Sequence, residues 1–298
     1  MAGPGDGSGA GRRGEDRRGS AARTGRSAGG QGRGGGSRSG PPDSTDGRRF
    51  RGDSRSRAAN GPDRSRRGPE GKADGPQIPD DVTGRELDKF VHRQLSGLPV
   101  KIVERVAAHL VMAGRLADED AETAYAHAKA ARTMAARVAV VREAVGETAY
   151  ACARYAEALA ELRAAKRMNG SWDYLPIMAD CERALKRPER AVALSQEAGV
   201  SRLDQAGQVE IVIVAAGARR DMGQLEAALQ LLESSPLGSR SRQPWVARLR
   251  YAYADALEAA GRTDEAITWF HRTVAADVHA ATDADDRLAA LGVDTGLD

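Results

Sequence analysis

The chain is poor in cysteine and histidine, the residues that most often hold metals or form disulfide frameworks. Its 298 residues include two cysteines, Cys152 and Cys181, whose spacing matches neither kind of site. We expect two reduced, buried thiols, as in a cytoplasmic protein. The five histidines are scattered and form no HExxH motif. The sequence therefore predicts no metal and no other cofactor.

The chain also lacks a long apolar run. Its most apolar stretch, residues 209–218, has about half of the ~20 residues that a bilayer-spanning helix needs. The first thirty residues are dominated by Gly, Arg and Ser and contain no apolar segment of a secretion signal. We therefore predict a cytoplasmic protein that is not inserted in a membrane.

Aromatic residues are scarce as well, at 4% of the chain, and Phe50 is the sole aromatic residue before residue 78. The first 77 residues hold 21 of the 34 glycines. Such a segment buries too little apolar surface to offset the entropy of ordering. We predict that residues 1–78 form a disordered basic tail, and that residues 79–298 form the folded domain.

Charge divides the chain at the same place. Residues 1–80 carry 17 Lys and Arg against 10 Asp and Glu, a net charge of +7. The remaining residues carry 28 against 32, a net charge of −4. A basic tail thus precedes a mildly acidic domain.

The folded domain repeats one spacing of small residues. Four of them are each followed twelve residues later by an alanine: Gly146 by Ala158, Ala179 by Ala191, Ala216 by Ala228, and Ala254 by Ala266. Small side chains are needed where two antiparallel helices cross closely. A large residue stands one helical turn after three of these alanines, at Leu162, Leu232 and Phe270. The pattern predicts one helix–turn–helix unit copied several times.

This unit resembles the tetratricopeptide repeat (TPR), a helix–turn–helix of about 34 residues. The strongest likenesses are the segments 223–229 and 261–267 (GQLEAAL and GRTDEAI). The repeat around Ala191 is weaker, because Lys186 replaces the turn glycine. We expect its two helices at about residues 172–185 and 188–198. The Arg-rich, Lys-poor composition is similar to that of family members from high-GC actinobacteria.

The resemblance implies an all-α, TPR-like α-solenoid of stacked antiparallel helix pairs. The clear repeats cover about residues 138–278. A degenerate pair lies at about 98–131, and a capping helix lies at about 283–291.

No motif of enzyme chemistry stands out. The tail contains GxGxxG strings by composition, without the strand and helix of a dinucleotide fold. There is no P-loop, no GxSxG, and no nucleophile beside a base. Glu143 and Glu147 lie one helical turn apart, and we interpret them as a solvent-facing acidic stripe. We predict that the protein is not an enzyme.

The resemblance implies instead a concave groove, lined by the first helix of each pair, that binds a peptide or a helix. The candidate groove residues carried over from the family are Glu143, Glu147, Tyr150, Asp180, Arg183, Arg220, Tyr251 and Asp255. With their groove neighbours they carry a net charge of −4. An acidic groove favours a basic partner. We therefore predict a scaffold that binds a basic protein or peptide, and the chain's own tail is one candidate ligand.

The tail supports an alternative function. Its Arg-Gly and Ser-Arg strings, for example residues 32–39, resemble RNA-binding segments of low complexity. Seventeen basic residues can attract phosphates, although ten acidic residues interrupt them. The alternative is a protein associated with RNA or with the ribosome through this tail.

Overall fold

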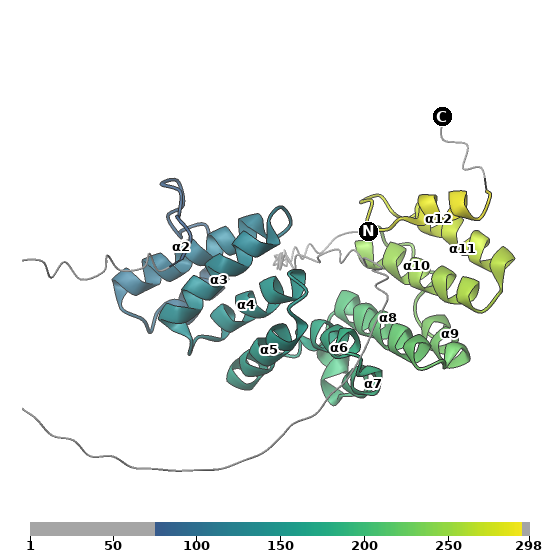
Figure 1. The fold of residues 1–298 in the computed structure, drawn as a ribbon, viewed down its shortest axis with the longest axis horizontal. Coiled ribbons are helices and arrows are strands. Elements are labelled where there is room, and N and C mark those ends of the chain that lie inside the picture. Colours follow the sequence, from purple (N-terminus) through teal and green to yellow (C-terminus); the bar gives the residue numbers. More distant parts are fainter. Residues whose placement is uncertain (1–74, 294–298) are drawn as a thin grey trace, which may run out of the picture. The chain divides into compact units, whose positions relative to one another are not determined.

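The computed structural model describes residues 75–293, which fall into two compact units, residues 75–231 and residues 232–293 (Figure 1). Helices and turns make up the described residues, which contain no β-strand. This confirms the predicted all-α fold. The predicted tail disorder and RNA binding concern residues 1–78, of which residues 1–74 lie outside the described part, and both remain predictions.

The helices come in consecutive pairs joined by short turns. The unit of residues 75–231 begins with α1 (Lys89–Leu95), α2 (Val100–Leu116), α3 (Ala121–Ala135), α4 (Ala139–Ala151) and α5 (Tyr155–Asn169). It continues with α6 (Leu175–Ala184), α7 (Pro188–Ser195), the 3₁₀ helix η1 (Ala198–Arg202) and α8 (Gln205–Asp221). Helix α9 (Leu225–Glu233) precedes α10 (Pro244–Ala259), α11 (Thr263–Val274) and α12 (Ala284–Ala290).

Stacked pairs form the unit of residues 75–231. Helices α2 and α3, α4 and α5, and α6 and α7 pack as pairs, and the second helix of each pair packs on the first helix that follows. In residues 232–293, α10 and α11 form a pair and α12 packs against α11. The described fold is therefore TPR-like, as the resemblance implies.

The twelve-residue spacing marks the helix crossings, as predicted. All eight small residues are buried; Ala158, for example, has no exposed surface. A Cβ atom added to Gly146 would lie 2.6 Å from atoms of Leu162. The glycine thus lets α4 approach α5 closely. Leu162 and Phe270 are fully buried beside their crossings.

The turns between paired helices use the left-handed backbone conformation even where glycine is absent. Gly223 and Gly261 have φ angles of 74° and 75°. At equivalent turns Ala153 has φ 56° and Lys186 has φ 62°. The weak repeat therefore keeps the turn geometry of the others, at a steric cost to the two residues that have a Cβ atom.

One predicted pair is shorter than its pattern suggested. The helix expected from Trp172 begins instead at Leu175, and the helix expected to reach Ala198 ends at Ser195. The indole ring of Trp172 packs over Gly199 of η1, where an added Cβ atom would lie 1.8 Å from the ring. Closing this contact bends the chain out of the regular repeat.

A segment of turns and bends, residues 76–88, precedes α1 and packs along α2; we call it the strap. Val82 of the strap is 7% exposed and contributes to an apolar cluster with Ala108, Val111 and Met112 of α2. Arg115 holds Asp81 at 3.0 Å. The strap therefore covers apolar surface at the first helix pair.

Candidate interaction face

The predicted groove residues lie on the first helices of the pairs and fall into two sets. Within residues 75–231, Glu143, Glu147 and Tyr150 belong to α4, Asp180 and Arg183 to α6, and Arg220 to α8. Within residues 232–293, Tyr251 and Asp255 belong to α10. We call the side of α4, α6 and α8 that carries the first set the first-helix face. The two sets are described separately.

A chain of polar contacts links successive helices on the first-helix face. The Tyr150 hydroxyl donates a hydrogen bond to Asp180 Oδ2 at 2.5 Å. Arg183 lies 3.7 Å from Asp180 on the same helix, and its Nε donates to Asp221 Oδ2 at 2.6 Å. Burial, with the charge of Asp180 added, raises the pKa of Tyr150, so its hydroxyl stays a donor at neutral pH. Three predicted residues thus form one connected group.

Gly217 of α8 makes room for the central arginine of this group. A Cβ atom at Gly217 would lie 2.7 Å from Arg183 Cζ, so a larger residue would displace the guanidinium. Burial lowers the pKa of Arg183, but the hydrogen bond to Asp221 and the charges of Asp221 and Asp180 together outweigh burial, and the net shift is upward. Because Gly217 of α8 has no side chain, it leaves the space that the Arg183 guanidinium of α6 occupies.

Glu143 corrects the interpretation of a solvent-facing acidic stripe. It is half-buried, and its Oε2 accepts a hydrogen bond from the Tyr174 hydroxyl at 2.9 Å. Burial raises the pKa of the Glu143 carboxyl. Glu147 is exposed, as the interpretation requires. The stripe is thus wrong for Glu143, because Tyr174, in the loop before α6, covers it.

In residues 232–293, Tyr251 and Asp255 hold a side chain that the groove prediction did not include. Arg287 of the short helix α12 donates to the Tyr251 hydroxyl and to Asp255 Oδ1, each at 3.1 Å, and to Glu258 Oε2 at 2.6 Å. Its guanidinium also lies 5.1 Å from the ring centroid of Phe270. We call Tyr251, Asp255, Glu258 and Phe270 the α10 site.

The two sets share one chemical arrangement, a guanidinium beside a tyrosine and carboxylates. Burial opposes the charge of Arg287, but hydrogen bonds to Glu258 and Tyr251 raise its pKa overall. Burial raises the pKa of Tyr251 to about 12, so it is neutral at pH 7. Arginines of the chain itself thus compensate several of the acids that made the predicted groove negative. The net charge summed over the groove residues could not show this pairing, because Arg287 was not among them.

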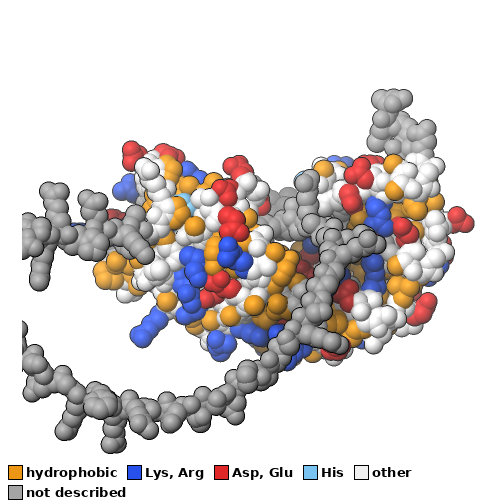
Figure 2. Space-filling view, in the orientation of Figure 1, with side chains coloured by type: hydrophobic (Ala, Val, Ile, Leu, Met, Phe, Trp, Pro, Cys, Tyr) orange, Lys and Arg blue, Asp and Glu red, His pale blue; other side chains and the backbone are white. Residues whose placement is uncertain are grey.

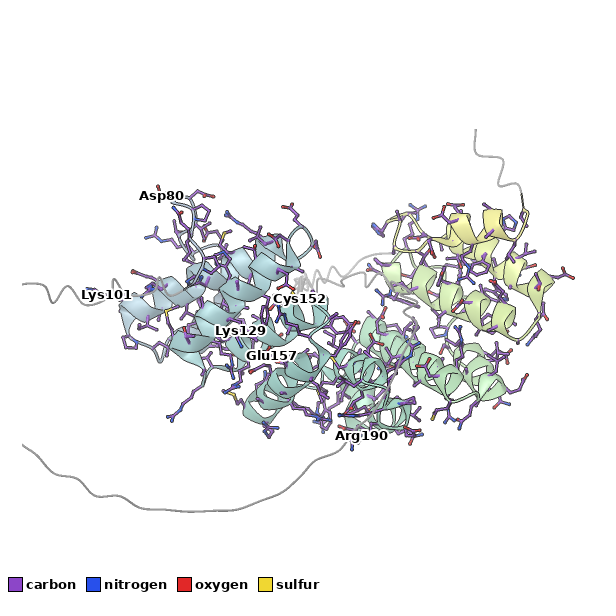
Figure 3. The ribbon with its side chains drawn as sticks, viewed as in Figure 1. Asp80, Lys101, Lys129, Cys152, Glu157 and Arg190 are labelled. Carbon is purple, nitrogen blue, oxygen red and sulfur yellow. The ribbon has the colours of Figure 1, made fainter. Side chains whose placement is uncertain are left out.

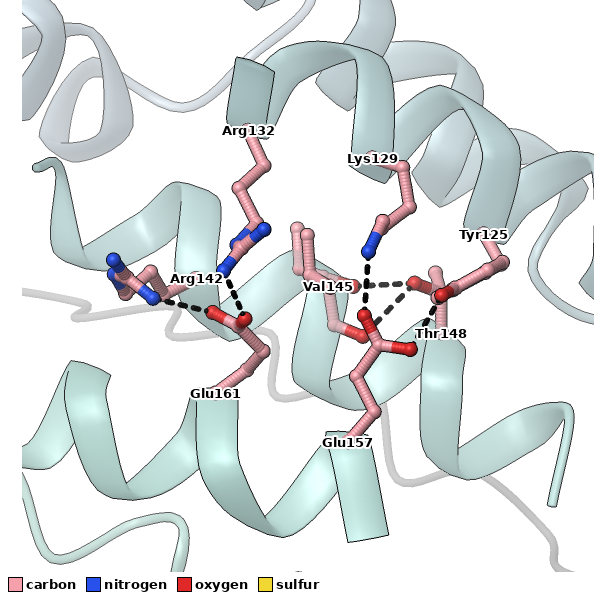
Figure 4. Close-up of polar contacts among 9 residues, drawn as sticks. Tyr125, Lys129, Arg132, Arg142, Val145, Thr148, Glu157 and Glu161 are labelled. Atoms are coloured by element: carbon pink, nitrogen blue, oxygen red, sulfur yellow. Dashed lines mark hydrogen bonds and ion pairs between the residues drawn. The ribbon is translucent and has the colours of Figure 1, made fainter. Parts of the chain in front are cut away.

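A second polar network connects α3 and α5, with Arg142 of α4 also taking part, and the sequence did not predict it. Glu157 lies between Lys129 and Tyr125 at 2.6 and 2.5 Å, and Glu161 lies between Arg132 and Arg142 at 2.7 and 2.8 Å (Figure 4). Lys129 and Glu157 extend toward each other from neighbouring helices (Figure 3). In the space-filling view, cations lie beside carboxylates over this region (Figure 2). The network joins one helix pair to the next.

Two buried histidines also meet within the first pair. His109 of α2 and His127 of α3 are 2% and 1% exposed, and their Nδ1 atoms lie 2.9 Å apart. They are distant in sequence but about equally far from the turn at Asp118. Equal distance from a helix-pair turn is a signal that could have identified this contact.

Two hollows lie in the unit of residues 75–231. One of about 620 Å³ lies between the strap and α2. The other, of about 470 Å³, is lined by Trp172, Met178 and cations of α5. Two of those cations are held by acids, Arg163 by Glu182 at 2.5 Å and Lys166 by Glu197 at 2.7 Å. The second hollow is therefore bordered largely by ion pairs within the chain.

Both cysteines are free thiols. Cys181 is buried, and burial raises its pKa to about 12. Cys152 is half-buried, and its Sγ donates to the Ala121 carbonyl at 3.1 Å. Within residues 75–293, no group of three or more His, Cys, Asp and Glu side chains is placed to hold a metal ion. No helix in the same range combines the length and apolarity needed to cross a bilayer.

Comparison with known proteins places the repeats in a recognised class. Residues 219–291 match the family model of the tetratricopeptide repeat, a segment that covers α9 to α12. No curated protein is similar enough to the chain to match it. The crystal structure of YrrB, described as a TPR protein with an unusual peptide-binding site, is similar to 67% of this chain and 97% of its own, with 16% identity and a TM-score of 0.40. The matched segment is thus similar to tetratricopeptide repeats.

Proposed function

We propose that this protein is a non-catalytic scaffold that holds another polypeptide on the first helices of its TPR-like pairs. The observation that carries the proposal is the contact of Tyr150, Asp180 and Arg183 on the first-helix face. These side chains are partly exposed, yet hydrogen bonds and ion pairs fix their positions. A surface whose polar groups are ordered before binding loses less entropy when a partner docks.

The contrast with the other polar groups supports this assignment. Glu161 of the α3–α5 network is enclosed by Arg132 and Arg142, and its side chain is 6% exposed. The side chains of Asp180 and Arg183 are 27% and 36% exposed. A partner can therefore reach the first-helix face without breaking the contacts that hold helix pairs together.

The partner's chemistry follows from the same residues. Tyrosine, carboxylate and guanidinium together favour a polypeptide with both hydrogen-bonding and basic groups. Because Arg183 compensates Asp180 and Asp221, we propose that recognition depends on these directed contacts more than on net negative charge.

Selection of peptides from a random library against the full-length chain tests the proposal. The decisive variant is Glu147→Lys, which reverses a charge at an exposed position of α4. The matched control is Glu189→Lys, the same reversal at an exposed position of the second helix α7. We expect the selected peptides to bind the Glu147→Lys variant at least about tenfold more weakly, a loss of ~1.4 kcal/mol, and the control unchanged.

Two results would count against the scaffold. One is a selection that enriches no peptide above an unrelated helical protein. The other is a set of peptides that bind Glu147→Lys normally but fail on Glu189→Lys, which would move the binding surface to the second helices.

A further inference from the structure

The α10 site offers two carboxylates and a phenol to a single guanidinium. The two terminal nitrogens of Arg287 divide these acceptors: Nη1 contacts Tyr251 and Asp255, and Nη2 contacts Glu258. We propose that the α10 site is an arginine-binding site, and that Arg287 is an intramolecular occupant which an arginine of a partner polypeptide displaces. This inference rests on the proposed scaffold function and names the partner's chemistry at one site.

The geometry selects arginine over lysine. A planar guanidinium presents its nitrogens as a fork and can contact Asp255 and Glu258 at once, whereas an ammonium is a single point of charge. The guanidinium also lies 5.1 Å from the centroid of Phe270 and 5.9 Å from that of Tyr251. Planar cations are favoured over such rings. Lysine would lose both advantages.

The charge of the site favours a basic ligand. Asp255 and Glu258 are the two carboxylates that Arg287 contacts. Tyr251 stays neutral because its pKa is raised to about 12. Carboxylates on neighbouring positions of one helix favour a cation over an anion at this site.

Helix α12 is shorter than the helices that it covers. It spans seven residues, and Ala284 and Leu288 are its buried residues. Short elements with few apolar contacts open at low free-energy cost. Arg287 can therefore leave the site without unfolding the α10–α11 pair.

Chemical rescue of full-length Arg287→Ala tests the site. The probes are N-acetyl-arginine amide and N-acetyl-lysine amide, and the readouts are the melting temperature and calorimetric titration. We expect the arginine probe to bind the variant with a Kd of roughly 1 mM, as for a ligand of few atoms. It should also raise the variant's melting temperature. The lysine probe should do neither, and the double variant Arg287→Ala, Asp255→Asn should lose the response.

Competition is measured with a short alanine peptide that carries one arginine. Because Arg287 occupies the site in the natural chain, the peptide should bind that chain at least about tenfold more weakly than it binds Arg287→Ala. Equal affinities for the two chains would overturn the proposal. So would a variant that has a lower melting temperature and is not rescued by the arginine probe, which is the result expected if Arg287 only holds α12 against α10. Should Arg287→Ala not fold, Arg287→Lys keeps the charge without the fork and is judged by the same arginine rescue.

These results separate the inference from the scaffold proposal. Rescue by the arginine probe establishes the site even if no library peptide binds the first-helix face. Conversely, peptides lost in Glu147→Lys support the scaffold even if Arg287→Ala is not rescued.

Discussion

His109 and His127 share one hydrogen bond between their Nδ1 atoms, which lie 2.9 Å apart inside the first helix pair. One ring must donate and the other must accept, so the contact requires at least one neutral ring. Adding a proton to the accepting ring would place two N–H groups face to face in a buried space. The contact therefore makes the first pair sensitive to acid.

The expected consequence is a loss of stability below about pH 6.5, the ordinary pKa of histidine. Burial lowers the pKa of His127 in the folded state. A lowered folded-state pKa contributes stability that is present above the unfolded pKa and disappears as pH falls through the folded one. Urea unfolding between pH 7.5 and pH 5 should show this decline. His127→Gln should flatten it, and His279→Gln, at an exposed position, should not. Parallel curves for all three chains would contradict the prediction.

In two of the turns between paired helices, a residue with a Cβ atom has a left-handed backbone, and replacing it with glycine should increase stability. Ala153→Gly and Lys186→Gly should each raise the free energy of unfolding by about 0.5–1 kcal/mol, because glycine adopts a positive φ without a Cβ clash. The converse change, Gly223→Ala, should lower it by about 1 kcal/mol, since nothing else lies within 4 Å of the added Cβ atom. Chemical denaturation measures all three. A loss of stability in both glycine variants would show that their side chains matter more than the backbone.

Ion pairs of similar length should contribute differently to the free energy of unfolding, according to how deeply they are buried. Glu182 has a fully buried side chain, and Arg163 holds it at 2.5 Å. Arg163→Met leaves that carboxylate with its longer contact to Arg187 at 3.5 Å and should lower the free energy of unfolding by about 3 kcal/mol. Arg262→Met removes a 2.7 Å pair whose acid, Glu265, is 55% exposed, and its effect should be much smaller. Equal effects in thermal unfolding would mean that burial does not set the value of these pairs.

The contact between Trp172 and Gly199 predicts a sharp response to one methyl group. Gly199→Ala places a Cβ atom 1.8 Å from the indole, so the ring must move, at a cost of about 2 kcal/mol or more. Tryptophan fluorescence and near-ultraviolet circular dichroism should both change. Gly97→Ala, where nothing lies within 4 Å, is the matched control and should leave both spectra unaltered. An unaltered spectrum for Gly199→Ala would rule out the described packing.

The helix pairs could be predicted because their signals are local. A twelve-residue spacing, such as that from Gly146 to Ala158, indicates a crossing within one helix–turn–helix unit. A glycine such as Gly261 indicates the turn of such a unit. Both follow from the chain's immediate neighbours in sequence. The two places where boundaries shifted, before α6 and after α7, depend on Trp172 reaching Gly199, a contact outside the repeat pattern.

The contacts of the candidate groove residues were harder to predict, because they join different repeats. The family pattern gives the positions of Tyr150 and Asp255 but not the partners that their side chains meet. Tyr150 contacts Asp180, thirty residues later in the sequence. Asp255 contacts Arg287 on α12, which was predicted as a capping helix with no part in the groove. The burial of Glu143 likewise depends on Tyr174 in the next repeat. Side-chain partners at such separations are set by packing rather than by spacing.

The strap has a practical consequence for any shortened form of this protein. A protease product that starts at α1 would lack Val82 and would expose Ala108, Val111 and Met112 to water. Bare apolar side chains on adjacent turns of a helix attract the same surface on another molecule. Such a product should form dimers or larger particles as its concentration rises, whereas a form that begins before Gly75 should stay dispersed.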